Sequence, residues 1–325
     1  MSGENTQILR HLLALNEIEY DVDLAKQSLT GMVSNDILPI VAYPDTMQKF
    51  KSLMSYVANN GVAYEVVGAL TNTYLADGFC RDIVVKTTKL KGISQKENGA
   101  IIAECGCNLT KISRDLSDHG ITGYEGLVGI PGTVGGAVVN NSGGFDSSMD
   151  KVVKRVLVLE NGVERWFDKN EMGFENRSSI LKKGKRHAVV LAAELDVSHK
   201  RAQGEIDVDL EKYAKFRKKW IDGRRKSLGS VFCAQSFSEL VKRHKVRFAV
   251  KRFLSVFLRI FIKNPRLNVW LDFFFFGNAK MAKHCDSLNR FCWDEDTTEQ
   301  DFMRYMEFMQ DRAGGRLKLE IEIKK

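Results

Sequence analysis

The stretch YEGLVGIPGTVGGAVVNNSGG, residues 124–144, says more about the fold than any other part of this sequence. It holds six glycines between Gly129 and Gly144, one proline and almost no charge. Glycine reaches positive φ and has no Cβ, so the N–H groups of such a tract can approach an anion such as a pyrophosphate closely. We therefore expect a nucleotide cradle here, and a glycine-rich surface loop without a ligand is the alternative. Neither a dinucleotide G-x-G-x-x-G fingerprint nor a P-loop is present, so the cradle belongs to another class.

Length and composition are typical of a globular protein with two or three domains. The chain has 325 residues, 44% of them apolar and 28% charged, which is enough for a full hydrophobic core. Its 49 Lys and Arg against 41 Asp and Glu give a net charge of +8, which suits anionic substrates or surfaces. The basic residues are spread out except at 215–226 (KFRKKWIDGRRK), and no nucleic-acid-binding signature accompanies them, so we expect no nucleic-acid partner.

The cysteines and the N-terminus favour a reduced, cytoplasmic protein. None of the six cysteines forms a C-x-x-C pair. Cys105 and Cys107 would share one face of a strand, where two free thiols are more plausible than a metal site, so we expect no metal. The first residues, MSGENTQILRHLL, do not form a basic region followed by an apolar core, so nothing indicates secretion.

Helix and strand signals alternate through the first two thirds of the chain. A capped amphipathic helix is predicted over 45–60, with Asp45 at its start and Gly61 just beyond its end. Asn161-Gly162 is a strong hairpin signal between two β-rich runs in 152–167. The other predicted elements are strands over 63–67, 82–86, 99–106 and 188–197, and helices over 109–119 and 200–220.

The last hundred residues change character. Residues 248–263 are aromatic and basic, Pro265 follows, and 271–276 contain four consecutive phenylalanines. Charges interrupt this segment, so it is no transmembrane helix. Arg252, Ser255, Arg259 and Lys263 share one helical face, which allows a basic amphipathic helix on an anionic membrane; a buried or partner-covered helix is the alternative.

Two more elements are expected towards the end of the chain. A capping-box-like helix start lies at Thr298–Asp301. A closing strand over 316–325 is expected to place Leu317, Leu319, Ile321 and Ile323 on one face. Its two carboxylates, at 320 and 322, form either a solvated face or the floor of a site.

Several motifs occur together in an order that resembles one enzyme family, the UDP-N-acetylenolpyruvoylglucosamine reductases (UDP-N-acetylmuramate dehydrogenases). The resemblance covers residues 38–325, and the glycine tract is its most specific part. It is carried by Gly68-ALTN, Asp77-Gly-Phe, Gly126-Leu, GIPGTVGGA at 129–137, Asn141 with Gly143, Phe174-ENRSS, Gly229-SVF and Leu319-EIE.

The resemblance implies a fold and cofactors. The fold is α+β: an FAD-binding part of the PCMH (vanillyl-alcohol-oxidase) type with two subdomains, 1–89 and 90–216, and a C-terminal α/β substrate domain, 217–325, with an aromatic basic insertion near 248–276. The implied cofactors are FAD and NADPH, and the implied substrate is a UDP-sugar. The implied cofactor-binding residues are Gly68, Asn72, Gly129, Ile130, Pro131, Gly132, Thr133, Gly135, Gly136, Ala137 and Asn141.

The resemblance also implies three catalytic residues. Reduction of an enolpyruvyl ether leaves negative charge beside a carboxylate, which needs a cation and a proton source. Arg177 would supply the cation, Ser230 the proton, and Glu322 would share in stabilising the enolate-like intermediate.

The departures from the family pattern keep alternatives open. GALTN stands where family members carry a glycine-richer GGGSN, and Cys233-Ala-Gln stands where K-N-P is usual. The pattern is compatible with a relative acting on another sugar nucleotide in surface-polysaccharide synthesis. It is also compatible with a non-catalytic flavin- or nucleotide-binding partner of a membrane-associated complex, or with an oxidase of the same flavin fold.

Overall fold

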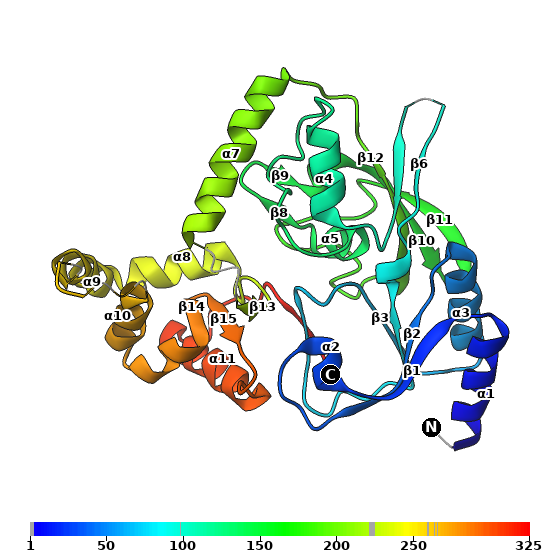
Figure 1. The fold of residues 1–325 in the computed structure, drawn as a ribbon, viewed down its shortest axis with the longest axis horizontal. Coiled ribbons are helices and arrows are strands. Elements are labelled where there is room, and N and C mark those ends of the chain that lie inside the picture. The colour runs from blue at the N-terminus through cyan, green and yellow to red at the C-terminus, as the bar shows by residue number, and fades with distance from the viewer. Residues whose placement is uncertain (1–2, 98, 221–224, 259, 263, 265) are drawn as a thin grey trace. The chain divides into compact units, whose positions relative to one another are not determined.

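Two parts of the chain each have a hydrophobic core of their own in the computed structural model, which describes residues 3–97, 99–220, 225–258, 260–262, 264 and 266–325. Unit 1 comprises residues 1–24, 37–70 and 80–219, and unit 2 comprises 25–36, 71–79 and 220–325. Figure 1 traces the chain through both units. Among the described residues, no helix combines the length and apolar character that crossing a bilayer requires. The mixture of helices with parallel and antiparallel sheets confirms the expected α+β class.

The first part of unit 1 is a four-stranded sheet in the order β1-β2-β5-β3. Its strands are β1 (Glu19–Ala25), β2 (Ile37–Tyr43), β3 (Tyr64–Val67) and β5 (Ile83–Lys86). β5 pairs in parallel with both β2 and β3. β2 and β5 read as nearly continuous apolar runs because the central strands of a parallel sheet are covered on both faces. Helices α1 (Gly3–Leu15) and α3 (Met47–Asn59) contribute to the same core cluster as β2 and β5.

The second part of unit 1 is a five-stranded antiparallel sheet in the order β11-β10-β12-β7-β6. Its strands are β6 (Ile93–Gln95), β7 (Ile101–Glu104), β10 (Val153–Glu160), β11 (Val163–Asp168) and β12 (Ala188–Leu195). The helical segments of this part are η1 (Thr87–Lys89), α4 (Leu109–Ser117), α5 (Val134–Asn140), α6 (Met149–Val152) and α7 (Gln203–Trp220), and a short ribbon joins β8 (Gly143–Gly144) to β9 (Ser147–Ser148).

Local signals predicted half of these elements, namely α3, α4, α7, β3, β5, β7, β10, β11 and β12. The β10–β11 turn is the predicted Asn161-Gly162 hairpin, with φ of 50° and 77°, as a type I′ turn requires. The predicted capping residue of α3 was wrong by one position: Thr46 caps the helix by accepting the N–H of Lys49, while Asp45 forms an ion pair with Lys49 at 3.1 Å. Helix α5, inside the glycine tract, was not predicted, and neither were α1 and β1.

Unit 2 contains helices around two small sheets, ordered β13-β15-β14 and β16-β4. Its elements are α2 (Lys26–Thr30), β4 (Thr73–Leu75), β13 (Lys226–Ser227), α8 (Ala234–Arg243), α9 (Lys245–Leu258), α10 (Leu267–Phe276), η2 (Ala279–His284), β14 (Cys285–Ser287), β15 (Arg290–Trp293), α11 (Glu299–Ala313) and β16 (Glu322–Lys324).

Two short early segments complete the core of unit 2. Met32 and Tyr74 are buried in its core cluster, and the Tyr74 ring meets the Phe302 ring edge-on with 4.8 Å between centroids. β4 pairs in parallel with β16 at the other end of the chain. The sequence analysis expected each domain to be one continuous range of residues. The division into units differs from this at 25–36 and 71–79, because aromatic packing and this strand pairing attach both segments to the C-terminal part.

The capping box at the start of α11 is confirmed: Thr298 and Asp301 each bond the other's backbone. The regular alternation expected over 316–325 is wrong at Leu319, which is 39% exposed. Only Glu322–Lys324 form a strand with β4, and the residues before them bridge to a different segment, at Phe232. This change of partner breaks the period-2 pattern.

The aromatic segment divides between core and surface. In α10, Leu271, Phe273 and Phe276 are buried, whereas α9 has no buried residue. A buried helix, the alternative left open by the sequence, therefore describes α10 but not α9. Three residues of the sequence pattern, Arg259, Lys263 and Pro265, lie outside the described residues.

Candidate functional site

The glycine tract places two backbone N–H groups at the start of α5. Thr133 caps this helix, its side chain accepting the N–H of Gly136 at 3.3 Å. Gly129 and Gly132 have φ of +86° and +132°, conformations that favour glycine. Within the described part of the chain, no hydrogen bond uses the N–H of Gly132 or of Thr133. Two adjacent donors at a helix start are suited to bind an anion.

Other glycines of the tract are explained by packing within unit 1. A Cβ on Gly135 would lie 2.8 Å from the Cβ of Cys105, and one on Gly143 would lie 2.5 Å from the carbonyl oxygen of Ser147. These positions exclude any larger residue whether or not a ligand is present. The glycine density of the tract thus reflects close packing at some positions and exposed backbone at others.

The Gly68 loop lies against the same helix start. A Cβ on Gly68 would be 2.5 Å from Thr133 Oγ1, so the two segments touch without room for a side chain. Leu70 has a φ of 55°, in the left-handed region that costs a residue with a Cβ about 1–2 kcal/mol. Ala69 is exposed. The structure therefore brings Gly68 and Thr133 together, two residues that the sequence proposed for one cofactor site.

The remaining residues of the proposed cofactor set differ in exposure. Pro131 is exposed, Ile130 and Gly136 are half-buried, and Ala137 is buried. Asn72 lies in unit 2, where its amide donates to the carbonyl of Glu320 at 3.3 Å and its own carbonyl accepts the N–H of Glu322.

Arg217 of α7 lies over the glycine tract and was missed by the sequence reasoning. Its guanidinium donates to the carbonyls of Val128 and Gly126, the latter at 2.7 Å. Its carbon Cζ lies 5.1 Å from the centroid of the Phe145 ring, which stacks on Tyr213 at 3.9 Å. No carboxylate pairs with it among the described residues, and burial lowers the pKa of Arg217. The basic run at 215–226 was the only signal in the sequence that pointed to it.

Arg177 occupies a tight turn that is tied to the glycine tract. The turn closes through two hydrogen bonds between the backbones of Glu175 and Ser178, and Arg177 has a φ of 58°. The amide of Asn141 donates to the carbonyl of Glu175 at 2.9 Å, and its oxygen accepts the N–H of Asp150. Both ends of the Asn141 side chain are therefore used by the protein, and one of them holds the turn that carries Arg177.

Ser230 and Glu322 lie on neighbouring backbone segments of unit 2. The carbonyl of Val231 accepts the N–H of Glu320 at 2.9 Å. Ser230 is exposed, and Glu322 is half-buried and pairs with Lys324 at 2.6 Å. The Asn289 side chain, another residue the sequence did not indicate, bonds both the N–H and the carbonyl of Phe232 at 2.8 and 2.7 Å. These bonds fix the chain two residues beyond Ser230.

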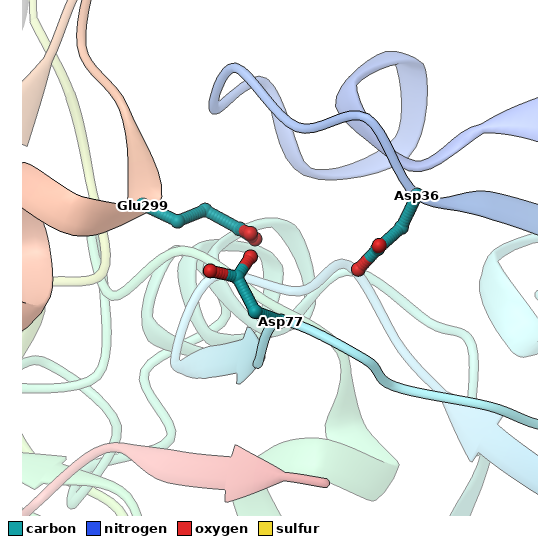
Figure 2. Close-up of side chains that lie close together, drawn as sticks. All are labelled: Asp36, Asp77 and Glu299. Carbon is teal, nitrogen blue, oxygen red and sulfur yellow. The ribbon is translucent and has the colours of Figure 1, made fainter.

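Three carboxylates of unit 2 converge on the ammonium of Lys26. Figure 2 shows Asp36, Asp77 and Glu299 pointing toward one another, with one oxygen of each within 4.8 Å of the others. Lys26 Nζ lies 2.6 Å from Asp36, 2.9 Å from Glu299 and 3.9 Å from Asp77. The Lys26 ammonium therefore supplies the positive charge that balances this cluster. Its hydrogen bond to Asp36 lowers the pKa of that carboxyl.

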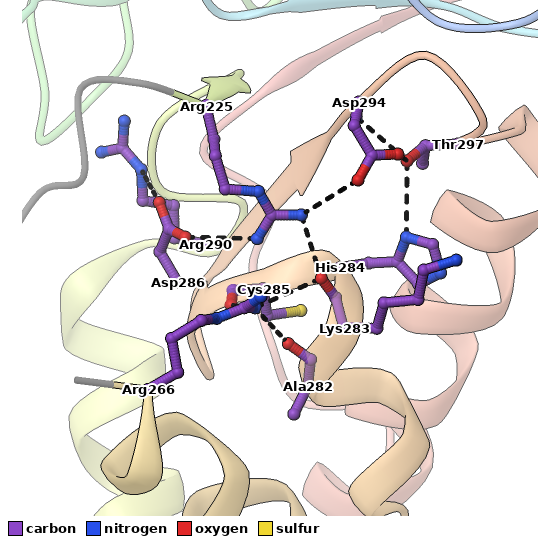
Figure 3. A network of polar contacts seen from close by, with 10 residues as sticks. All are labelled: Arg225, Arg266, Ala282, Lys283, His284, Cys285, Asp286, Arg290, Asp294 and Thr297. Carbon is purple, nitrogen blue, oxygen red and sulfur yellow. Dashed lines mark hydrogen bonds and ion pairs between the residues drawn. The ribbon is translucent and has the colours of Figure 1, made fainter. Parts of the chain in front are cut away.

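A second polar network surrounds His284 (Figure 3). Arg266 donates to the carbonyls of Ala282 at 2.6 Å and Cys285 at 2.9 Å. Arg225 donates to the carbonyl of Lys283 at 2.9 Å. Burial is the main cause that lowers the pKa of His284. These side chains hold the η2–β14 turn by bonding its backbone carbonyls. The network around His284 is therefore explained by a structural role.

Comparison with known sequences matches one segment of the chain to a family. The FAD binding domain family matches residues 38–166, a range that contains every proposed cofactor residue from Gly68 to Asn141. This part of the chain is therefore an FAD-binding domain.

Relatives extend the similarity beyond that domain. The UDP-N-acetylenolpyruvoylglucosamine reductase of Bacillus licheniformis is 28% identical over 222 residues, which cover 67% of this chain and 73% of that protein. The reductase of the same name from Caldanaerobacter subterraneus is 32% identical over 194 residues, 59% of this chain and 63% of that one.

A solved structure has the same fold over nearly its whole length. The UDP-N-acetylenolpyruvylglucosamine reductase MurB of Thermus caldophilus matches with a TM-score of 0.66 and 19% sequence identity. The match covers 95% of this chain and 99% of that one. This likeness is one of fold, and it confirms the expected fold class.

Proposed function

The chain is a divergent member of the UDP-N-acetylenolpyruvoylglucosamine reductase family, and on this premise we propose that it is an FAD-dependent oxidoreductase of peptidoglycan precursor synthesis. Its substrate would be the enolpyruvyl group of UDP-N-acetylglucosamine enolpyruvate, its product UDP-N-acetylmuramate, and its reductant NADPH. The observation that carries this proposal is that an FAD-binding domain family matches the segment with the glycine tract, where two N–H groups at the start of α5 make no hydrogen bond to the described residues.

The residues of the tract fit a flavin dinucleotide. The N–H groups of Gly132 and Thr133 would bind its pyrophosphate, and the contact between Gly68 and Thr133 Oγ1 would bring a second backbone segment close to it. The dipole of α5 and the nearby Arg217 cation both favour negative charge at this place. When bound, FAD would accept hydride from NADPH and pass it to the terminal carbon of the enolpyruvyl group.

Three side chains would perform the remaining chemistry. Arg177 would bind the substrate carboxylate, which its planar guanidinium can do with two parallel hydrogen bonds. Its left-handed backbone, held by Asn141, is the kind of local strain that is often kept at functional positions. Ser230 would give its hydroxyl proton to the carbon next to the carboxylate, and Glu322 would share in stabilising the charge that develops there.

A second candidate is a related flavoprotein that acts on another sugar nucleotide. Two observations in unit 2 favour it: α8 begins directly after Cys233, where the family usually has K-N-P, and α9 and α10 form an additional helical segment. Both changes lie in the part of the chain that would recognise the substrate, so they would alter specificity before they altered the flavin chemistry.

Flavin reduction by NADPH and flavin reoxidation by the substrate can be measured separately, which tests the proposed role of Ser230 and distinguishes the two candidate functions. FAD-reconstituted protein is mixed anaerobically with NADPH, and the loss of visible flavin absorbance is timed; the reduced protein is then mixed with UDP-N-acetylglucosamine enolpyruvate. Ser230→Ala is expected to leave flavin reduction unchanged and to slow the second step about 10²–10⁴-fold, the usual effect of a lost acid. Equal losses in both steps would mean that Ser230 only maintains the fold. Reoxidation by another enolpyruvyl sugar nucleotide alone would favour the second candidate.

A further inference from the structure

Helix α9 presents an apolar stripe to solvent. Val246, Val250, Phe253 and Phe257 recur with spacings of four, three and four residues, so they lie on one face of the helix. Phe253 is 75% exposed and Val246 69%. Beyond the helix, Ile260, Phe261 and Ile262 are also exposed. Soluble proteins rarely expose such a continuous apolar surface without a binding role.

The opposite face of α9 is fixed to unit 2. Lys251 pairs with Asp272 of α10 at 2.8 Å, and both side chains are largely buried, at 18% and 14% exposed. The Phe248 ring packs on Phe276 with 5.5 Å between centroids. Because these contacts hold the inner face, the apolar stripe cannot turn inward without breaking this partly buried ion pair.

Basic side chains flank the stripe, and no acidic residue accompanies them. Between Glu239 and Asp272 the sequence has nine Lys or Arg and neither Asp nor Glu. Lys242, Lys245 and Arg252 are exposed, and no carboxylate of the described chain pairs with them. Two aromatic rings of α10, Trp270 and Phe274, stack at 5.0 Å and are also exposed, by 44% and 53%.

We propose that the exposed face of α9 binds an anionic lipid surface, with the apolar stripe inserted at the level of the headgroups and the flanking cations on the lipid phosphates. An apolar face between basic flanks is the pattern of a helix that lies in a membrane interface. A second copy of the chain fits less well, because a symmetric pairing of this face would bring together two sets of cations with no acids between them.

Vesicle sedimentation tests this proposal on the full-length, FAD-reconstituted protein. The protein is expected to sediment with vesicles made of equal parts of phosphatidylcholine and phosphatidylglycerol, to bind pure phosphatidylcholine far more weakly, and to dissociate as salt is raised. Phe253→Asp combined with Phe257→Asp is expected to lower the bound-to-free ratio by about ten-fold or more. Lys245→Gln combined with Arg252→Gln should weaken binding and reduce its dependence on salt.

Val208→Asp is the matched control, because Val208 is a 64% exposed apolar residue on α7 and lies outside α9 and α10. It is expected to leave vesicle binding unchanged, and circular dichroism and flavin content verify the fold of each variant. Absence of binding to anionic vesicles, equal binding to neutral ones, or equal loss in the Val208 variant would overturn the proposal. So would a protein dimer that the Phe253 and Phe257 changes dissociate in the absence of lipid, since a second copy would then cover this face.

Discussion

Replacing Lys26 with methionine is expected to destabilise the protein by about 3 kcal/mol at neutral pH, the low end of the range for breaking a buried ion pair. Lys26 is fully buried, whereas its partners differ: Glu299 is 4% exposed, Asp36 30% and Asp77 65%. Methionine keeps the length of the side chain but removes the charge. Water can solvate the two aspartates, so the loss comes mainly from Glu299 and from the carbonyls of Leu75 and Ala76, which lose a donor.

The destabilisation caused by Lys26→Met is expected to depend on pH. Without the ammonium, a buried Glu299 is expected to take up a proton more readily than in the unfolded chain, since burial disfavours the charged form. The destabilisation should therefore be largest at neutral pH and smaller near pH ~5. In the unaltered protein the lowered pKa of Asp36 gives the opposite behaviour: its contribution is present above the ordinary value of 3.8 and is lost as the pH falls through the lowered value.

Urea denaturation followed by circular dichroism at both pH values measures the effect. Lys215→Met is the control, because its pair with Glu211 is exposed on both sides, at 74% and 66%, and such pairs contribute about 0–1 kcal/mol. Adding Glu299→Gln to Lys26→Met should restore part of the lost stability. A loss below about 1 kcal/mol for Lys26→Met, or the same loss at both pH values, would refute the account of Lys26 as the neutralising charge.

Three further substitutions test the glycine tract, the Gly68 loop beside it and the Arg217 side chain that lies over it. Leu70→Gly should relieve left-handed strain of about 1–2 kcal/mol, partly offset by a glycine entropy cost of about 0.5–1 kcal/mol. Because it restores a glycine where the family usually has one, it should also tighten FAD binding measured by fluorescence titration, and weaker binding would contradict this expectation. Arg217→Met leaves two carbonyls without a donor, so urea unfolding should show a loss of about 1–3 kcal/mol together with weaker FAD binding; unchanged affinity would limit Arg217 to a stabilising role. Thr133→Ala removes a helix cap and should cost about 0.5–2 kcal/mol in the same denaturation assay, and an unchanged midpoint would show that the cap contributes nothing.

Local sequence signals predicted the elements that local chemistry determines. The hairpin at Asn161-Gly162 and the capping box at Thr298 depend on residues within a few positions of each other, and both are present. Helix α5 was missed because it is short and contains two glycines, so propensity argues against it. It begins where Thr133 accepts the N–H of Gly136, a capping signal without the usual apolar periodicity.

Contacts between distant parts of the chain were beyond sequence reasoning. Nothing near Lys26 or Tyr74 indicates that these residues belong to the core of unit 2, where their partners include Glu299 and Phe302. The same holds for Arg217, which bonds carbonyls about ninety positions earlier in the chain. The proposed residues of the site were found through motif resemblance, whereas the side chains that support them became visible only in the structure.

The central claim, that this chain is a flavin-dependent reductase of an enolpyruvyl sugar nucleotide, is tested most directly by one anaerobic experiment. The protein is reconstituted with FAD, reduced with NADPH and mixed with UDP-N-acetylglucosamine enolpyruvate while the flavin spectrum is recorded. We predict that NADPH bleaches the flavin and that the substrate restores its absorbance with formation of UDP-N-acetylmuramate. A protein that binds no FAD, or a bound flavin that NADPH does not bleach, would contradict the claim.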